Sequence, residues 1–388
     1  MVETKSTEQI RTAQSCAQNP REAAREFHSK VIQPNTALVI FFCSPEYDLN
    51  ILEEEMARLF AGVEIVGCTT AGEIGPAGYR EHSIAGASFP AGVCTAVTGH
   101  LDHLQIFGIT KGQNFVKNLL QQLEDHAADA SPQNTFAFLM IDGLSIREEP
   151  VAHVLQKTLG TIPLVGGSAG DGLRFANTYV YYKDRFHADS AVLALITTTL
   201  PFSIFKTQHF IPGEERLVVT EADTVHRNVR EINGLPAVKE YARVAGADPD
   251  NLGSDCFAVS PVVVLIDGTN CVRSIQKVNP DGSLTFYCAI EEGLVFRVAT
   301  GHDLEGNLSR ALERLQDEIG PLQLLLGFDC ILRKLEIIHD GLQEKVEEIM
   351  RHYNTVGFNT YGEQFRGIHV NQTLTGIAIG KVNETPDA

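Results

Sequence analysis

Three histidines precede apolar runs by one to four residues, a position that suits a metal or haem ligand. The histidines and the runs that follow them are His82 with 83–89, His187 with 191–196, and His369 with 373–379. A neutral imidazole is a common metal ligand, and a b-type haem needs only one axial histidine beside an apolar slot. No CxxCH motif is present, which excludes covalent c-type attachment. All three histidines are therefore candidate ligands, although an isolated histidine is more often structural.

The densest group of polar side chains lies near the C-terminus, within fifteen residues. Its members are Asn359, Thr360, Tyr361, Glu363, His369, Asn371, Gln372 and Thr373. Side chains on a strand pair and its loop can converge on a small polar ligand. We therefore take Tyr361, Glu363, Asn371 and Thr373 as candidate ligand-binding residues. The alternative, which the sequence leaves open, is a hairpin whose Asn and Thr side chains satisfy local backbone groups.

Patterns that would indicate catalysis are weak. The glycine-rich stretch 166–170 lacks the Gly-Lys-Ser/Thr end of a Walker A loop, and it is not a GxGxxG fingerprint. No HExxH zinc motif occurs in the chain. We therefore expect that the chain is not an enzyme. The alternative is a cysteine-dependent enzyme with Cys68 or Cys330 as its nucleophile.

A strand–helix–strand pattern that occurs three times must position these residues. The three sets, each written as strand, helix and strand, are 37–43, 49–60 and 64–68; 135–141, 148–159 and 164–166; and 321–330, 342–353 and 355–359. The first and third sets share a phrase, VGCTTAGE at 66–73 and VGFNTYGE at 356–363. We interpret the pattern as an internal repeat. It predicts an α/β fold with two domains of mixed β-sheet and packed helices.

Local signals predict where helices begin and where domains divide. Asp48 is expected to cap the helix 49–60, and Asp340 with Gln343 to form a capping box for the third helix. The first twenty residues look weakly ordered. The predicted division is an N-terminal extension with a helix at 1–30, a first domain at 31–230 and a second domain at 231–388.

Composition and charge exclude several classes of function. The chain has 388 residues and a net charge of −18, which leaves no basic stripe for nucleic acid or for an anionic membrane. Its apolar runs are far shorter than the roughly 20 residues of a membrane-spanning helix. The N-terminus lacks the apolar region of a secretory signal, and the eight cysteines form no CxxC pair. We expect a cytoplasmic protein without nucleic-acid or membrane partners; a homodimer stays open.

Several segments resemble the FIST family. The segments are IVGCTTAGEIG at 65–75 for the FIST N-terminal domain, and VGFNTYGE at 356–363 with HVNQTLT at 369–375 for the FIST C-terminal domain. Phe328, Cys330 and Arg333 also resemble the family's Phe-x-Cys-x-x-Arg segment. Cys330 and Arg333 therefore join the candidate ligand-binding residues.

The resemblance implies a sensory ligand-binding protein in bacterial signal transduction. The chain is similar to the stand-alone members of the family that sense nitric oxide through haem and act on a partner histidine kinase. On this basis the expected cofactor is haem b, held by His82, His187 or His369. The alternative is a FIST-type sensor of an amino acid or another small metabolite without haem.

Overall fold

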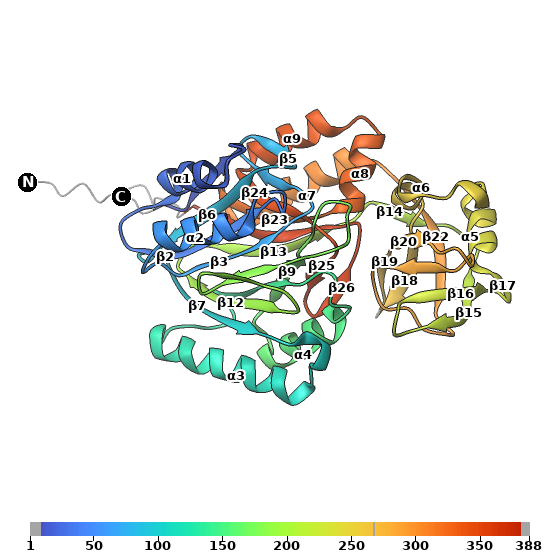
Figure 1. Cartoon of the computed structure of the whole chain (residues 1–388), viewed down its shortest axis with the longest axis horizontal. Coiled ribbons are helices and arrows are strands. Elements are labelled where there is room, and N and C mark those ends of the chain that lie inside the picture. Colours follow the sequence, from blue (N-terminus) through green and yellow to red (C-terminus); the bar gives the residue numbers. More distant parts are fainter. Residues whose placement is uncertain (1–8, 267, 382–388) are drawn as a thin grey trace, which may run out of the picture.

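The computed structural model describes residues 9–266 and 268–381, which form a large body and a smaller lobe (Figure 1). Residues 9–207 and 302–381 make the body. The lobe, residues 210–301, is inserted between these two segments. Helices and strands occur in both parts, which confirms the predicted mixed α/β class. No helix of the described residues is long and apolar enough to cross a membrane.

Three strand–helix–strand units form the body, as the repeat predicts. The units are β2 (Thr36–Cys43), α2 (Leu49–Leu59) and β3 (Ile65–Thr69); β8 (Thr135–Ile141), α4 (Glu148–Leu159) and β9 (Leu164–Ser168); and β23 (Leu322–Cys330), α9 (Gln343–His352) and β24 (Thr355–Thr360). In each unit the two strands pair in parallel. The second strand therefore ends at the same edge of the sheet as the first, and the loops that follow the strands lie together.

Each unit sends a hairpin into the sheet of another unit. The hairpins are β4 (Glu73–Gly75) with β5 (Gly78–Arg80), β10 (Val180–Tyr182) with β11 (Arg185–His187), and β25 (Glu363–Phe365) with β26 (Ile368–Val370). Strand β4 pairs with β24, β10 with β3, and β25 with β9. The three units are thus linked in a closed ring. The predicted domain boundaries stay a prediction, and the hairpin β25–β26 completes a sheet of the first predicted domain.

Antiparallel strands and outer helices complete the body. These elements are β1 (Arg11–Ser15), β6 (Ile84–Pro90), β7 (Cys94–Leu101), β12 (Ala191–Thr198), β13 (Phe202–Thr207), β27 (Leu374–Gly380), α1 (Pro20–Val31), α3 (Ile109–His126) and α7 (Leu304–Ile319). Strand β1 pairs with β6 from Arg11 opposite Ser88 onward. The prediction of weak order up to residue 20 is therefore wrong for 11–15, because main-chain pairing fixes this segment to the sheet.

A shared core lies between the three sheets. Ile40 and Phe42 of β2 point into this core, whereas Val39 and Phe41 point to a second core that includes residues of α1 and α2. Phe42 stacks on a phenylalanine of β24 at a centroid distance of 4.6 Å. Because both faces of these strands are buried, their sequences are nearly continuous apolar runs.

The lobe has its own sheet and apolar core. Its elements are β14 (Phe210–Pro212), β15 (Leu217–Asp223), β16 (Asn228–Ile232), β17 (Leu235–Pro236), β18 (Val262–Ile266), β19 (Thr269–Arg273), β20 (Ile275–Val278), β21 (Leu284–Phe286), β22 (Val295–Gly301), α5 (Ala237–Ala245) and α6 (Ser254–Val259). Figure 1 shows the lobe beside the part of the body that carries α8 (Ile331–His339).

Helix α8 breaks the regularity of the three units. It begins directly after β23, with Cys330 as its N-cap, so the third unit carries α8 in addition to α9. The predicted cap at Asp48 is confirmed, since its side chain accepts hydrogen bonds from two backbone amides of α2. The predicted capping box of Asp340 and Gln343 is wrong. Leu342 is the N-cap of α9 and makes no side-chain cap, because Asp340 instead ends α8.

Candidate functional site

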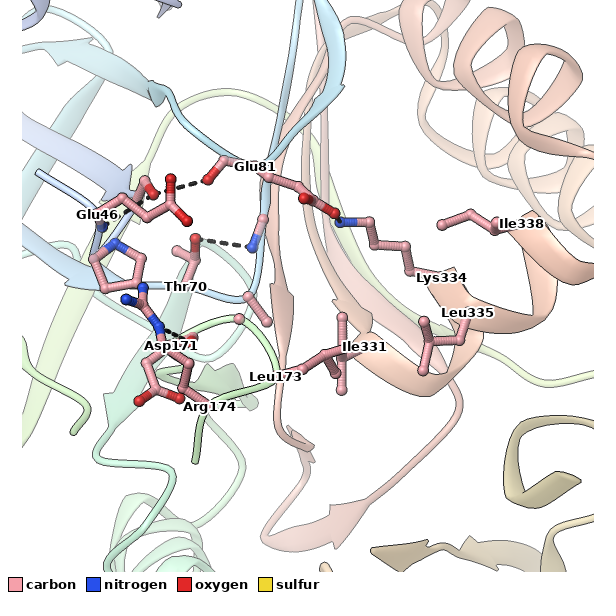
Figure 2. Close-up of a pocket in the computed structure, with 15 residues that line it drawn as sticks. Glu46, Thr70, Glu81, Asp171, Leu173, Arg174, Ile331, Lys334, Leu335 and Ile338 are labelled. Atoms are coloured by element: carbon pink, nitrogen blue, oxygen red, sulfur yellow. Dashed lines mark hydrogen bonds and ion pairs between the residues drawn. The ribbon is translucent and has the colours of Figure 1, made fainter. Parts of the chain in front are cut away.

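A cavity of about 300 Å³ lies where parts of all three units meet (Figure 2). Loops that follow the ends of β2, β3 and β9 line one side, a common place for ligands in α/β sheets. The lining residues are 44–46, 70–72, Glu81, 171–174, and Ile331, Lys334, Leu335 and Ile338 of α8. Its volume is at the lower end of the range for small-molecule sites. The cavity therefore suits a small metabolite.

Lys334 is the buried cation among the described residues that line this cavity. Its Nζ atom lies 3.1 Å from Oε1 of Glu81, and the side chains of the two residues are 8% and 80% exposed. Figure 2 shows Lys334 reaching from α8 across the cavity toward Glu81. Within the described residues no other hydrogen bond of this ammonium is found. Because an ammonium carries three donors, two are left for a ligand or for water.

Gly72 makes room for the end of Lys334. A Cβ atom at this position would lie 2.9 Å from Nζ of Lys334 and 2.8 Å from Oδ1 of Asn359. The φ angle of Gly72 is +135°, a conformation that L side chains rarely adopt. The glycine of the VGCTTAGE phrase is thus required by the wall of the cavity.

A buried ion pair supports α8 from behind. Nη1 of Arg333 lies 2.8 Å from Oδ1 of Asp329, and both side chains are almost fully buried. The Tyr79 hydroxyl donates to Oδ2 of the same carboxylate at 2.7 Å. Burial raises the pKa of Tyr79 well above its usual value, so the phenol stays protonated. Arg333, a predicted ligand-binding residue, is therefore committed to Asp329 and does not line the cavity.

The repeated phrase builds the same hydrogen-bonded cluster twice. In the first unit the Thr70 hydroxyl donates to Oε1 of Glu73 at 2.5 Å, and the Ser83 hydroxyl donates to Oε2 at 2.8 Å. In the third unit Glu363 accepts from Thr360 and, at 2.7 Å, from Thr373. Burial raises the pKa of Glu73 and of Glu363 to about 8. Glu363 and Thr373, both predicted to bind a ligand, are thus hydrogen-bonded to each other in the interior of the protein.

The two remaining predicted polar residues hold loops together. The Tyr361 hydroxyl donates to Asp171, which lines the cavity, and accepts from the amide of Asp171 at 3.1 Å. Asn371 accepts a hydrogen bond from the amide of Ser274 in the lobe at 3.4 Å. Tyr361 therefore positions a cavity loop, and Asn371 joins the body to the lobe.

The candidate nucleophiles are buried. Burial raises the pKa of the Cys68 and Cys330 thiols well above its usual value, which keeps both protonated and unreactive. Residues 166–170 read Gly-Gly-Ser-Ala-Gly and so match GxSxG, a pattern found in hydrolases. Ser168 is nevertheless fully buried, and its hydroxyl accepts a hydrogen bond from Gln364 at 2.8 Å.

The three candidate haem ligands lie on separate elements. His82 pairs with Glu46 at 3.3 Å and packs edge-on against Tyr47. The His187 ring lies 4.4 Å from that of His100, and its Nε2 is 3.1 Å from a backbone carbonyl. None of the three lines the cavity. No group of three or more metal-ligating side chains is found in the described part of the chain.

His369 is the most buried of the three. Its Nδ1 lies 3.1 Å from the Gln364 amide nitrogen, while its Nε2 has no hydrogen-bond partner among the described residues. A Cβ atom at Gly362 would lie 2.2 Å from the ring, so backbone packs against the imidazole where a porphyrin would have to lie. Burial lowers the pKa of His369 to about 4. The surroundings of His369 do not fit a haem, and haem b, with any of the three histidines as its ligand, stays a prediction from the resemblance.

Comparison with known families decides where the chain belongs. A model of the FIST N domain matches residues 37–235, and a model of the FIST C domain matches residues 237–366. The chain belongs to the FIST family. FIST domains are associated with the sensing of small ligands in signal transduction.

Individual relatives of this FIST protein are distant. An uncharacterized protein of Methanocaldococcus jannaschii is 23% identical over 88% of this chain and 73% of its own length. A crystal structure of cyanuric acid hydrolase from A. caulinodans covers 96% of this chain and 99% of its own, with 8% identity and a TM-score of 0.35. A second structure of cyanuric acid hydrolase covers the same shares, with 10% identity and a TM-score of 0.36.

These hydrolase structures correct the expectation that the chain is not an enzyme. Structures that match it over nearly its whole length are enzymes, and so that expectation no longer stands. At TM-scores below 0.5 the likeness assigns no reaction to this FIST protein.

The sequence patterns did not indicate Lys334, the buried cation of the cavity. Lys334 lies on α8, a helix that the sequence patterns did not predict, beside the predicted residues Cys330 and Arg333. The available signal was the spacing of Ile331, Leu335 and Ile338, which places three apolar side chains on one helix face.

Proposed function

We propose that this FIST protein is a sensor that binds a small metabolite in the cavity beside α8. Lys334 carries the proposal, because a buried ammonium with a single exposed partner has donors to offer to a ligand. Asp171 and Arg174 lie across from α8 in Figure 2, on the loop after β9. A ligand in the cavity would therefore contact all three units at once.

Helix α8 also connects the cavity to the lobe. Ile331 lines the cavity and belongs to the same apolar cluster as Ala258 and Tyr287 of the lobe. Oε1 of Glu336 lies 2.7 Å from Nε2 of His209, which directly precedes the lobe. A ligand that binds one position of α8 better than another would shift the lobe through these contacts. The lobe would then present the signal to a partner.

A thermal-shift screen of the full chain tests the proposal. Amino acids, carboxylates and haem are screened against the wild type, Lys334→Met and Lys345→Met, the last an exposed lysine on α9. We expect at least one metabolite to raise the melting temperature of the wild type and of the control, with the shift lost in Lys334→Met. A shift that persists unchanged in Lys334→Met would place the ligand elsewhere and overturn the proposal.

A more specific proposal rests on the family resemblance alone. In this proposal the protein senses nitric oxide through haem b and acts on a partner histidine kinase. An absorption spectrum of protein produced with a supply of haem tests it. A Soret band that moves on addition of nitric oxide would support this version, and a colourless protein that cannot be reconstituted would contradict it.

A further inference from the structure

We infer that the cavity takes a small carboxylate with an apolar tail and without an ammonium group. The inference rests on the proposed function, since it names the class of ligand for the same cavity. Three observations carry it: free cationic donors, side-chain carboxylates that are already engaged, and uncovered apolar side chains at the mouth.

The donors favour an anion. Lys334 is nine-tenths buried and bonded to one exposed carboxylate, that of Glu81. Arg174 also lines the cavity, and within the described residues the one hydrogen bond of its guanidinium runs from Nε to the backbone oxygen of Asp171 at 3.2 Å. Its terminal guanidinium nitrogens are therefore available. A ligand carboxylate that bonds to Lys334 would make a charge-assisted hydrogen bond, which is stronger than a neutral one.

The acceptors disfavour a ligand ammonium. The Asp171 carboxylate accepts hydrogen bonds from the backbone amides of Phe175, Ala176 and Asn177 at 2.8 to 2.9 Å. It also accepts one from the Tyr361 hydroxyl. Glu46 is half exposed and pairs with His82. The carboxylates around the cavity are thus already engaged, Glu81 by Lys334 itself. An ammonium moved from water into this site would lose hydration without gaining a free carboxylate.

Apolar side chains define the other end of the ligand. Leu173 and Ile338 line the cavity and are 54% and 47% exposed, so the mouth of the cavity presents apolar surface to solvent. Ile331 and Leu335 continue the same surface inward. Covering these side chains with a hydrocarbon tail removes apolar area from water. A volume of about 300 Å³ equals that of about ten water molecules, and so accommodates a ligand of roughly eight to ten non-hydrogen atoms.

Calorimetric titration of the full chain with three matched probes tests the inference. Isocaproate has the carboxylate and a branched tail, leucine adds an ammonium to the same skeleton, and isoamylamine has the ammonium without the carboxylate. We expect isocaproate to bind roughly tenfold or more tightly than leucine, and isoamylamine not to bind. Tighter binding of leucine or isoamylamine would overturn the inferred class, and so would failure of isocaproate to bind.

Variants separate a wrong ligand class from a wrong site. Lys334→Met should weaken isocaproate binding roughly tenfold or more, whereas Lys345→Met should leave it unchanged. Leu173→Glu places a like charge at the exposed mouth and should weaken binding more than Leu173→Gln, at a position where neither change disturbs a core. If Lys334→Met abolishes binding of a different class of ligand, the inferred class fails and the proposed function stands. If no ligand depends on Lys334, both fail.

Discussion

Nζ of Lys334 lies 3.1 Å from Oε1 of Glu81, although the lysine is buried and the glutamate is largely exposed. This asymmetry means that the carboxylate can swing into solvent while the ammonium cannot follow. A ligand anion would therefore compete with Glu81 for a fixed cation. The buried partner, not the exposed one, defines the site.

Glu81→Gln should separate the ligand role of this pair from any role in stability. Gln keeps an oxygen that can accept from the buried Lys334 ammonium but removes its counter-charge, so we expect a modest fall in melting temperature, smaller than that of Asp329→Ala. Loss of the competing charge should strengthen binding of a carboxylate ligand a few-fold. Calorimetric titration measures this, with Glu305→Gln as a matched control from the exposed pair Glu305–Lys345. Weaker binding in Glu81→Gln would show that Glu81 helps to hold the ligand.

The buried pair of Asp329 and Arg333 should be costly to break. Asp329→Ala leaves a buried guanidinium without its anion and the Tyr79 hydroxyl without its acceptor. We expect the free energy of unfolding to fall by about 3–5 kcal/mol. Denaturant unfolding measures this loss. The double variant Asp329→Leu with Arg333→Met should lose less than Asp329→Ala, and a larger loss would contradict this account of the pair.

The two buried glutamates should make stability fall as the pH rises. Glu73 and Glu363 keep their protons up to a pH of about 8 in the folded chain, because their folded pKa is raised from 4.5. Between these values the folded chain binds more protons than the unfolded chain, so the free energy of unfolding declines with pH in this window. The free energy of unfolding, measured by denaturant unfolding at each pH from 5 to 8, should depend less on pH in Glu73→Gln and in Glu363→Gln. If this pH dependence is unchanged in both variants, the raised pKa of these glutamates is contradicted.

The buried His369 should make the free energy of unfolding fall as the pH is lowered. Its folded pKa is lowered from 6.5 to about 4, so the unfolded chain binds the extra proton between these values. This contribution to stability is therefore complete above pH 6.5 and is lost as the pH falls toward 4. His369→Gln should remove that part of the acid sensitivity, whereas the exposed His103→Gln should not. Acid unfolding monitored by circular dichroism measures the difference, and identical curves for the wild type and His369→Gln would refute it.

The repeat could be predicted because its local chemistry is written in the sequence. The spacing of Thr70 and Glu73 recurs in Thr360 and Glu363, and both pairs form the same hydrogen bond in the structure. The exchange of hairpins between units could not be predicted. Pairing of β25 with β9 joins residues nearly 200 positions apart, and no periodicity within either strand specifies its partner.

His82 and His369 do not occupy equivalent positions of the repeat. In the hairpin of the first unit Glu73 lies opposite Arg80, and in that of the third unit Glu363 lies opposite Val370. The residue before each of these partners is Tyr79 in the first unit and His369 in the third, so these two positions are equivalent. His82 therefore has no equivalence to His369, although both precede an apolar strand. Position before a strand does not define a common site, whereas register in the hairpin does. Lys334 was not predicted because α8 occurs in one of the three units, and a repeat predicts only the elements that its units share.

A crystal structure of the full chain with the metabolite that gives the largest thermal shift tests the central claim most directly. We expect the ligand in the cavity between Leu173 and Ile338, with its anionic group within hydrogen-bond distance of Nζ of Lys334. Density for the ligand in another place, such as beside His187 or beside Leu265 of the lobe, with water in the cavity, would contradict the proposed site.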